Sequence, residues 1–147
     1  MSTIASITEL VQTVSEKNEL FKQIERVSEF LYQSDSILNV IQKHVEFEFA
    51  TQLVAYMHEH HITTPSGVEK VLQEIKNELK DRPVLQISLS PATPLHSLEL
   101  MKTWITTNVK QPVLLDIQHN PSIIGGLVLA FEGRYRDYSY KLSSPSL

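Results

Sequence analysis

Three of the four glycines in the sequence lie in one segment, Asn120 to Ser139. Gly125 and Gly126 are adjacent, as glycines often are in loops that bind phosphate. Such a loop joins a strand to a helix N-terminus and is usually followed by Lys and by Ser or Thr. Here the pair leads into the apolar run Leu127 to Phe131, with no Lys and no hydroxyl directly after it. The sequence therefore predicts a structural corner of a sheet, with no cofactor bound there.

A second cluster of residues that could do chemistry is His58-Glu59-His60-His61, with His44 earlier in the chain. On a helix only His58 and His61 share a face, because they are three residues apart. The zinc-protease spacing, with two histidines four residues apart, is not present. A small metal-dependent enzyme that uses His44, His58 and His61 stays open as an alternative. The favoured interpretation is a helix C-terminus, where imidazolium interacts well with the helix dipole.

The remaining residues do not form a recognisable catalytic set. There is no cysteine, which excludes disulfides, thiolate metal sites and a cysteine nucleophile. No serine lies in a Gly-x-Ser-x-Gly elbow. Nothing in the sequence pairs Asp116, Glu132 and Asp137 as acid and base. We therefore predict no catalytic residue, no metal ligand and no cofactor, and expect a protein that is not an enzyme.

Composition and charge describe an ordinary globular chain. Apolar residues make up 41% of the sequence and charged residues 20%. Thirteen basic residues face seventeen acidic ones, without a block of Lys or Arg, which argues against nucleic acid as a partner. No apolar run approaches the roughly 20 residues that cross a bilayer, and the opening residues show no signal-peptide pattern. We expect no direct membrane insertion and a cytoplasmic location.

Residues 1–81 show helical periodicity and predict a helical bundle. Ser6 and Glu9 have the spacing of a capping box at the start of the first helix. Val45 to Phe49 alternates like a strand, but apolar residues continue at helical spacing to His60, so we predict a helix there. Thr64-Pro65 is a typical N-cap and first residue of a further helix.

Residues 82–142 predict a small sheet domain, and 143–147 a flexible tail. We expect strands at Val84 to Leu89, Val113 to Ile117, Leu127 to Phe131 and Tyr135 to Leu142. The third is nearly all apolar and should be central and covered on both faces. Between the first two strands, a helix that follows Pro94 should turn inward Leu95, Leu98, Met101, Ile105 and Val109. The fold class is therefore α+β, a helical bundle followed by a βαββ sheet domain.

Apolar side chains on the helices of the bundle are candidates for binding a partner. Amphipathic helices commonly receive another helix in a groove between them. The alternative is that the same side chains simply close the bundle. The candidate residues are Ile7, Leu10, Val11, Val14, Phe47 and Phe49.

The glycine-containing segment resembles the C-terminal signature of the delta subunit of rotary ATP synthases, called the oligomycin-sensitivity-conferring protein in mitochondria. In that family an Asp/Asn-Pro-Ser-Ile/Leu-Ile-Gly-Gly run leads into an apolar strand. A glycine-containing turn and a strand with Asp-x-Ser follow. Leu85 to Leu95 resembles the family's preceding strand, turn and helix, so the resemblance covers about Pro83 to Leu142. The matching signature residues are Pro121, Ser122, Gly125, Gly126, Gly133, Asp137 and Ser139.

The resemblance implies a non-catalytic stator subunit that joins the catalytic head to the peripheral stalk. The family's helical bundle binds N-terminal helices of the alpha subunits, and its C-terminal domain binds the C-terminus of the stalk b subunits. The implied location is the cytoplasmic face of the bacterial inner membrane, as a peripheral protein. The helical half is shorter here than in the family, and its opening lacks the Tyr-Ala-x-Ala pattern. No contact residues are carried over to it, and a helix-binding adaptor outside the synthase remains an alternative.

Overall fold

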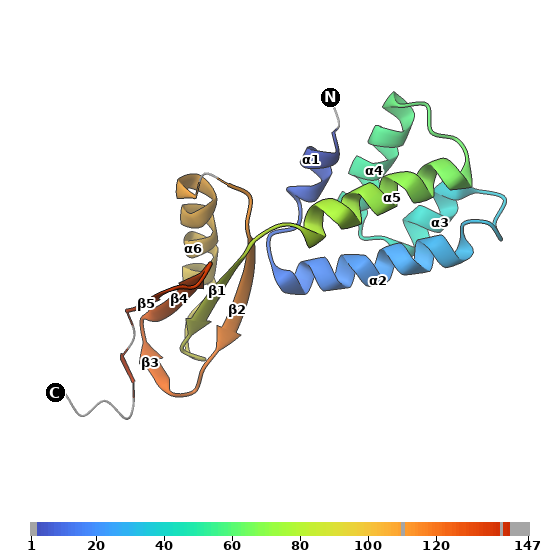
Figure 1. The fold of residues 1–147 in the computed structure, drawn as a ribbon. Coiled ribbons are helices and arrows are strands. Elements are labelled where there is room, and N and C mark those ends of the chain that lie inside the picture. Colours follow the sequence, from blue (N-terminus) through green and yellow to red (C-terminus); the bar gives the residue numbers. More distant parts are fainter. Residues whose placement is uncertain (1–2, 110, 139, 142–147) are drawn as a thin grey trace. The chain divides into compact units, whose positions relative to one another are not determined.

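The computed structural model describes residues 3–109, 111–138 and 140–141, and the expected tail 143–147 lies outside them. The chain divides between Asp81 and Arg82 into two compact units. The first unit is a bundle of helices and the second a sheet with one helix (Figure 1). The fold class is α+β, with the bundle first and the sheet second, as predicted.

The bundle holds five described helices. The helix predicted after Val45 is confirmed, because helical periodicity continues far beyond the short alternating stretch. Thr64 caps the last helix and Pro65 is its first residue, also as predicted. The bounds are α1 (Ile4–Thr8), α2 (Val14–Phe30), α3 (Ile37–His44), α4 (Phe47–Glu59) and α5 (Pro65–Lys80).

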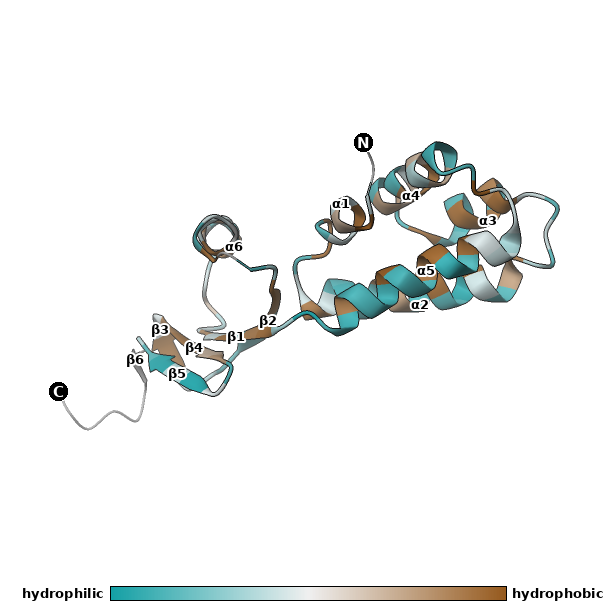
Figure 2. Cartoon of the chain, turned by 45° about the horizontal axis from the view of Figure 1, so that its top comes forward, coloured by the Kyte–Doolittle hydropathy of each residue, from teal (hydrophilic) through white to brown (hydrophobic). Residues whose placement is uncertain are grey.

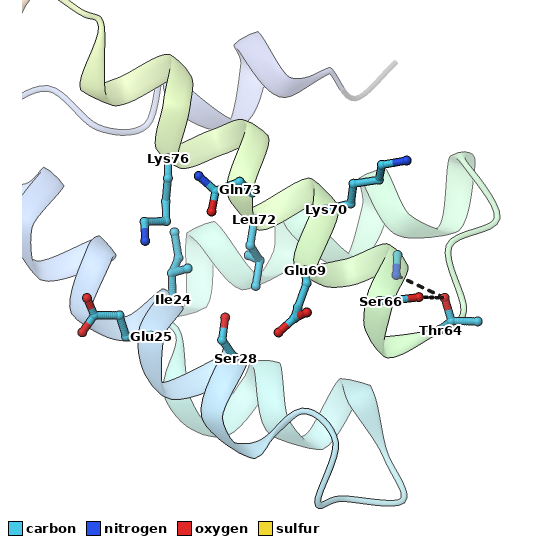
Figure 3. A pocket seen from close by; sticks show the side chains of 11 residues that line it. Ile24, Glu25, Ser28, Thr64, Ser66, Glu69, Lys70, Leu72, Gln73 and Lys76 are labelled. Atoms are coloured by element: carbon cyan, nitrogen blue, oxygen red, sulfur yellow. Dashed lines mark hydrogen bonds between the residues drawn. The ribbon is translucent and has the colours of Figure 1, made fainter.

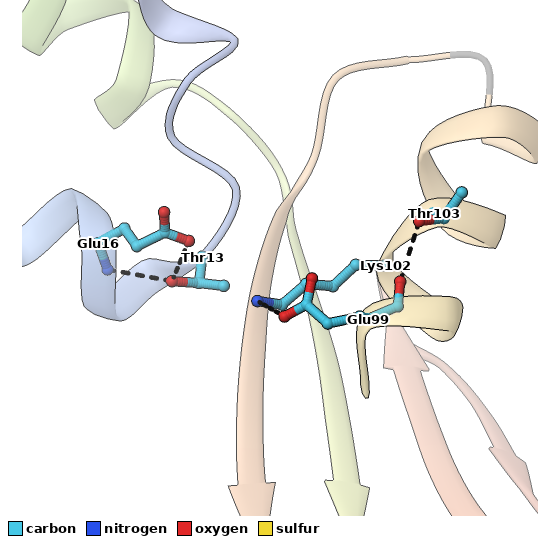
Figure 4. A network of polar contacts seen from close by, with 5 residues as sticks. All are labelled: Thr13, Glu16, Glu99, Lys102 and Thr103. Atoms are coloured by element: carbon cyan, nitrogen blue, oxygen red, sulfur yellow. Dashed lines mark hydrogen bonds and ion pairs between the residues drawn. The ribbon is translucent and has the colours of Figure 1, made fainter. Parts of the chain in front are cut away.

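The start of the bundle differs from the prediction. The capping box is formed by Thr3 and Ser6, whose side chains each accept a hydrogen bond from the other's backbone N–H. The expected box of Ser6 and Glu9 is wrong, because α1 already ends at Thr8 and Glu9 is its C-cap. A second helix then begins at Val14, with the Thr13 side chain accepting from the backbone N–H of Glu16 (Figure 4). The apolar residues from Ile7 to Val14 are thus divided between two helices and the segment that joins them.

The core of the bundle is aliphatic. Helix α1 packs on α4 and α5, and α2 packs on α3 and α5. Each fully buried Leu, Ile or Val stabilises the fold by about 1.5 to 3 kcal/mol relative to an exposed one. The most deeply buried side chains are Ile7, Ile24, Val27, Leu31, Ile41, Leu53, Val68, Leu72, Ile75 and Leu79.

The second unit is a four-stranded mixed sheet with strand order β2-β1-β4-β5. Strand β1 pairs with β2 in parallel and with β4 antiparallel, and β5 pairs antiparallel with β4. The parallel pair needs a crossover, which α6 provides. The bounds are β1 (Val84–Leu89), α6 (Leu95–Asn108), β2 (Leu114–His119), β4 (Leu127–Phe131) and β5 (Arg134–Asp137).

Helix α6 covers one face of this sheet. Its Ile105 packs with Leu85, Ile87, Leu89 and Leu115 into a buried cluster. Leu98, Met101 and Val109 pack against the cluster as predicted, but Leu95 is 73% exposed and does not belong to the inner face. Leu95 is the first residue of the helix, before the turns that pack on the sheet.

Strand β4 lies inside the sheet, as expected, but is covered less completely than predicted. Leu127, Leu129 and Phe131 face α6 and are half-buried, and Val128 on the other face is the buried residue of the strand. Two short strands were not predicted. Strand β3 (Ile123–Gly125) pairs antiparallel with β6 (Tyr140–Lys141), so the expected fourth strand is divided after Asp137.

Gly126 occupies the corner between β3 and β4. Its φ is +74°, in the left-handed region that side chains with a Cβ rarely adopt. The predicted structural corner is therefore confirmed, because Gly126 has the left-handed backbone that a tight corner needs. The same conformation recurs in the turn between β4 and β5, where Glu132 and Gly133 both have positive φ, the geometry of a tight two-residue hairpin.

We predict that Gly126→Val destabilises the protein by more than about 1 kcal/mol, because valine is strained at positive φ. Gly126→Asn is the matched control, since asparagine tolerates left-handed backbone and should cost clearly less. Urea unfolding followed by fluorescence of Trp104, the single tryptophan, reports on the second unit. An unchanged midpoint for Gly126→Val contradicts the corner role.

Candidate functional site

The family-like segment begins as a turn built around Asn120. Its side-chain oxygen accepts hydrogen bonds from the Ser122 backbone N–H at 3.0 Å and from the Ser122 hydroxyl at 2.8 Å. The Asn120 backbone N–H donates to the carbonyl of Leu89 at 2.8 Å, which ties the turn to the end of β1. Pro121 lies exposed in the turn and Ile123 is buried directly after it. The Asn-Pro-Ser-Ile run therefore folds the chain from β2 into β3.

A pocket of about 370 Å³ lies beside this corner, and we call it the corner pocket. One wall is the chain from Ile124 to Leu127, which holds both glycines. The other walls are the end of β1, the Ser90–Pro94 turn and the first turns of α6. Its lining is mostly apolar, with Ser90, Thr93 and Ser97 as the hydroxyl-bearing residues. The pocket can accept one large apolar side chain.

The other signature residues are spread along the following hairpin. Gly133 forms the turn, and no atom lies within 4 Å of the position that a Cβ would take there. Asp137 ends β5, opposite Val128 of β4. Ser139 lies outside the described residues. The signature thus spans the corner and the hairpin and does not converge on one cavity.

The candidate partner-binding residues of the bundle divide into core and surface. Ile7, Val11 and Phe49 are buried, so for these three residues the structure supports the alternative that they close the bundle. Leu10 and Val14 are half-buried on either side of the break between α1 and α2. Phe47 is 82% exposed, because it is the first residue of α4 and precedes the buried turn.

A groove of about 830 Å³ runs between α2 and α5 (Figure 3). Ile24 and Leu72 lie at its floor and are almost fully buried. Its walls combine apolar and polar surface. The charged lining residues are Glu25, Glu69, Lys70 and Lys76, and Lys76 also lies 5.6 Å from the centre of the Phe21 ring.

Glu69, one of these lining residues, also forms a hydrogen bond with Tyr32. The Tyr32 hydroxyl donates a hydrogen bond of 2.9 Å to the Glu69 carboxylate. This bond raises the pKa of Tyr32 above its usual value, with smaller effects from desolvation and from the charge of Glu69. Because the phenolate cannot donate, the bond is present at neutral pH and is lost only as the pH rises through the tyrosine pKa.

The histidine cluster lies at the C-terminus of α4, and its geometry explains one member. The Ile62 N–H donates to the Met57 carbonyl, and the His61 N–H donates to the His58 carbonyl. These are the two bonds of a Schellman cap, which places the residue at His61 in the left-handed region. His61 has φ +54° there, at a position where glycine is usual.

The metal alternative gains no support from this geometry. The His44 ring stacks on Phe30, with ring centres 5.0 Å apart, and the His60 ring contacts Tyr56. His58, His60 and His61 are exposed. Across residues 3–109, 111–138 and 140–141, no three His, Asp or Glu side chains are grouped as metal ligands. Nor do these residues include a helix with the length and apolar character to cross a membrane.

No model of a known protein family matches the sequence, and a search of the curated proteins found no relative. The resemblance of the Asn120 to Ser139 segment therefore rests on the quoted residues alone.

Sequence reasoning missed two exposed apolar residues of α6, Leu100 and Trp104, which are 58% and 63% exposed. The helical pattern there is apolar on more than one side. Because the apolar residues cover more than one side of the helix, the pattern does not identify the buried face clearly. It also does not show which apolar residues remain exposed to solvent.

We predict that His61→Gly stabilises the protein by about 0.5 to 1 kcal/mol, because glycine removes the left-handed strain at the helix cap. His58→Gly, two residues before the C-cap in the same helix, is the control. It should destabilise by up to about 1 kcal/mol, since glycine costs backbone entropy in a helix. Thermal unfolding followed by circular dichroism measures both. A destabilising His61→Gly contradicts the cap assignment.

The two phenylalanines of α4 provide a second test. We expect Phe49→Ala to destabilise by about 3 to 5 kcal/mol, the usual cost of removing a buried phenylalanine. Phe47→Ala should change stability by no more than about 0.5 kcal/mol, because its side chain is already in solvent. Urea unfolding of both variants measures the difference. Similar losses for the two variants are incompatible with the burial described.

Proposed function

We propose that this protein is a non-catalytic connector, a stator subunit of a rotary ATP synthase that joins the catalytic head to the peripheral stalk. The observation that carries the proposal is the Asn120 to Ser139 segment, whose order of residues resembles the delta-subunit signature. A connector needs two separate binding surfaces and no chemistry of its own. In this role the chain acts at the cytoplasmic face of the bacterial inner membrane as a peripheral subunit.

The division into two units supports the proposal. Each unit has its own apolar core, so each can bind a different partner without the other unfolding. We assign the alpha-subunit N-terminal helices to the bundle and the C-terminus of the stalk b subunits to the sheet unit. Phe47 is the bundle residue most available for such contact, because an exposed aromatic ring is a common anchor at protein interfaces.

The local structure of the signature supports a mechanical role. Asn120 binds both Ser122 and the end of β1, and Gly126 allows the chain to reverse tightly into β4. These contacts hold the corner to a central strand through backbone groups. A stator must resist torque, and a corner bonded to the sheet transmits force better than a loose loop.

We predict that the full chain bridges two probes. A tagged C-terminal segment of a stalk b subunit should retain the catalytic head on a column only when this protein is present. The reason is that each probe binds a different unit. Retention is measured by the amount of alpha subunit eluted with the tag.

The bridging experiment has a matched pair of variants. Phe47→Ser should reduce retention of the head while leaving binding to the stalk segment unchanged. Leu38→Ser removes a half-exposed leucine of α3 and is the control, expected to bridge normally. If the wild-type chain binds neither probe, the stator proposal is wrong. Binding to one probe only supports an adaptor instead.

A further inference from the structure

One flank of α6 carries two large apolar side chains in solvent. Leu100 and Trp104 are four residues apart and therefore lie one turn apart on the same side of the helix. The neighbouring Thr103 and Thr107 turn their hydroxyls back onto carbonyls of α6 itself. Their methyl groups thus remain for contact. This flank offers apolar surface without a charged group of the helix upon it.

The flank of Leu100 and Trp104 faces the β4 side of α6. Ser97 lies on the same flank, seven residues before Trp104, and it lines the corner pocket together with Ile124 to Leu127. None of the described residues of β2 lines that pocket. Glu99 and Lys102, which form the 3.6 Å ion pair of α6 (Figure 4), lie on a different side of the helix from Trp104, because they are five and two residues before it.

Two arginines of β5 belong to the face of the sheet on which α6 packs. In the antiparallel pairing Arg136 is opposite Leu129 and Arg134 is opposite Phe131. Directly paired residues project to the same face of a sheet, so both arginines lie on the face that α6 covers. Figure 2 shows β5 as a hydrophilic strand beside apolar β4.

The arginines also lie at the right level along the helix. As the crossover between parallel strands, α6 runs opposite to β1 and hence along the direction of β4. From Ser97 to Trp104 the helix rises about 10 Å, which equals about three residues of a strand. Ser97 and Leu127 both line the corner pocket, so we take them to be at the same level. The rise of the helix from Ser97 then places Leu100 and Trp104 beside the part of β4 that pairs with Arg136 and Arg134.

We propose that this surface, formed by Leu100, Trp104, Arg134 and Arg136 and ending at the corner pocket, binds an amphipathic helix edged with acidic residues. The apolar stripe of the partner helix packs along α6, and one of its large side chains enters the corner pocket. Its carboxylates meet the two arginines. The proposal stands on the chemistry of the surface and does not depend on which protein supplies the helix.

The charges select this occupant. Arg134 and Arg136 are exposed, and neither has an ion-pair partner among the described residues. Glu132, two residues before Arg134, lies in the exposed turn and is likewise unpaired within the described part of the chain. Asp137 follows Arg136 directly, but it is paired with Val128 and therefore projects to the opposite face of the sheet. A second copy of the same surface brings arginine toward arginine, which disfavours self-association. A basic helix meets the same repulsion.

The test uses two designed helical peptides with one shared leucine stripe, edged by glutamates in one and by lysines in the other. Each is labelled and titrated with the full-length protein by fluorescence anisotropy. We expect the glutamate peptide to bind on the order of tenfold more tightly, and this preference to shrink at high salt. The emission of Trp104 should shift to shorter wavelength on binding. Equal binding of both peptides, or binding of neither, overturns the proposal.

Two variant pairs locate the binding. Arg134→Glu/Arg136→Glu should reverse the preference toward the lysine peptide, whereas Lys43→Glu/Lys70→Glu makes the same charge change on the bundle and should preserve it. Leu100→Ser should weaken binding of the glutamate peptide about tenfold or more, because a leucine contact is lost. Leu95→Ser is its control, an exposed leucine on another flank of α6. If either control loses as much as its partner variant, the surface is wrongly placed.

Discussion

The pairing of β1 with strands on both sides is the interaction on which the second unit depends. Its register with β2 and β4 sets where every later residue lies. The parallel partner requires α6 as a crossover, and the antiparallel partner brings the family-like segment back beside the end of β1. Even the Asn120 turn is held by this strand, through the carbonyl of Leu89. A slip of one residue in β1 would turn Leu85, Ile87 and Leu89 away from α6.

The bundle depends on a different constraint, the burial of aliphatic side chains from helices that each pack against the core through one face. This requirement explains why most of the apolar residues that could have formed a partner surface are not available for one. Ile7 and Phe49 are part of this buried core. Phe47 remains exposed because it is the first residue of α4, before the turn that packs in the core. The exposed apolar surface of the bundle is therefore narrower than its apolar pattern indicates.

Long periodic patterns made most of the helices and strands predictable. Helix starts were harder to predict where several residues could act as the N-cap, and so were strands of only two or three residues. The helix around Leu53 followed from spacing alone, and Thr64-Pro65 marked the next helix start correctly. At the N-terminus several hydroxyl residues compete to cap. Thr3 and Thr13 are the N-caps, and Ser6 is not, so the apolar pattern is divided between two helices. Strands β3 and β6 are too short to show a periodicity of their own.

The site residues were predictable only where the backbone demands a particular residue. Gly126 could be assigned to a corner because few residues other than glycine adopt its conformation. His61 shows the converse, since a histidine occupies a cap position that usually takes glycine. The sequence correctly favoured a helix C-terminus for this cluster, but it did not show which histidine takes the left-handed conformation. Leu100 and Trp104 could not be recognised as exposed, because their solvent exposure depends on where α6 lies over the sheet.

The two units also differ in the charge they present, which bears on how a connector keeps its partners apart. Acidic residues outnumber basic ones in the bundle, and basic residues outnumber acidic ones in the sheet unit. An acidic helix that fits beside Arg134 and Arg136 is therefore repelled from the bundle, while a basic one is favoured there and disfavoured on α6. In the connector proposed above, apolar anchors such as Phe47 and Trp104 would supply affinity for either kind of helix. The opposite charge balance would then decide which helix each unit accepts, so that the two ends of the chain are not exchanged.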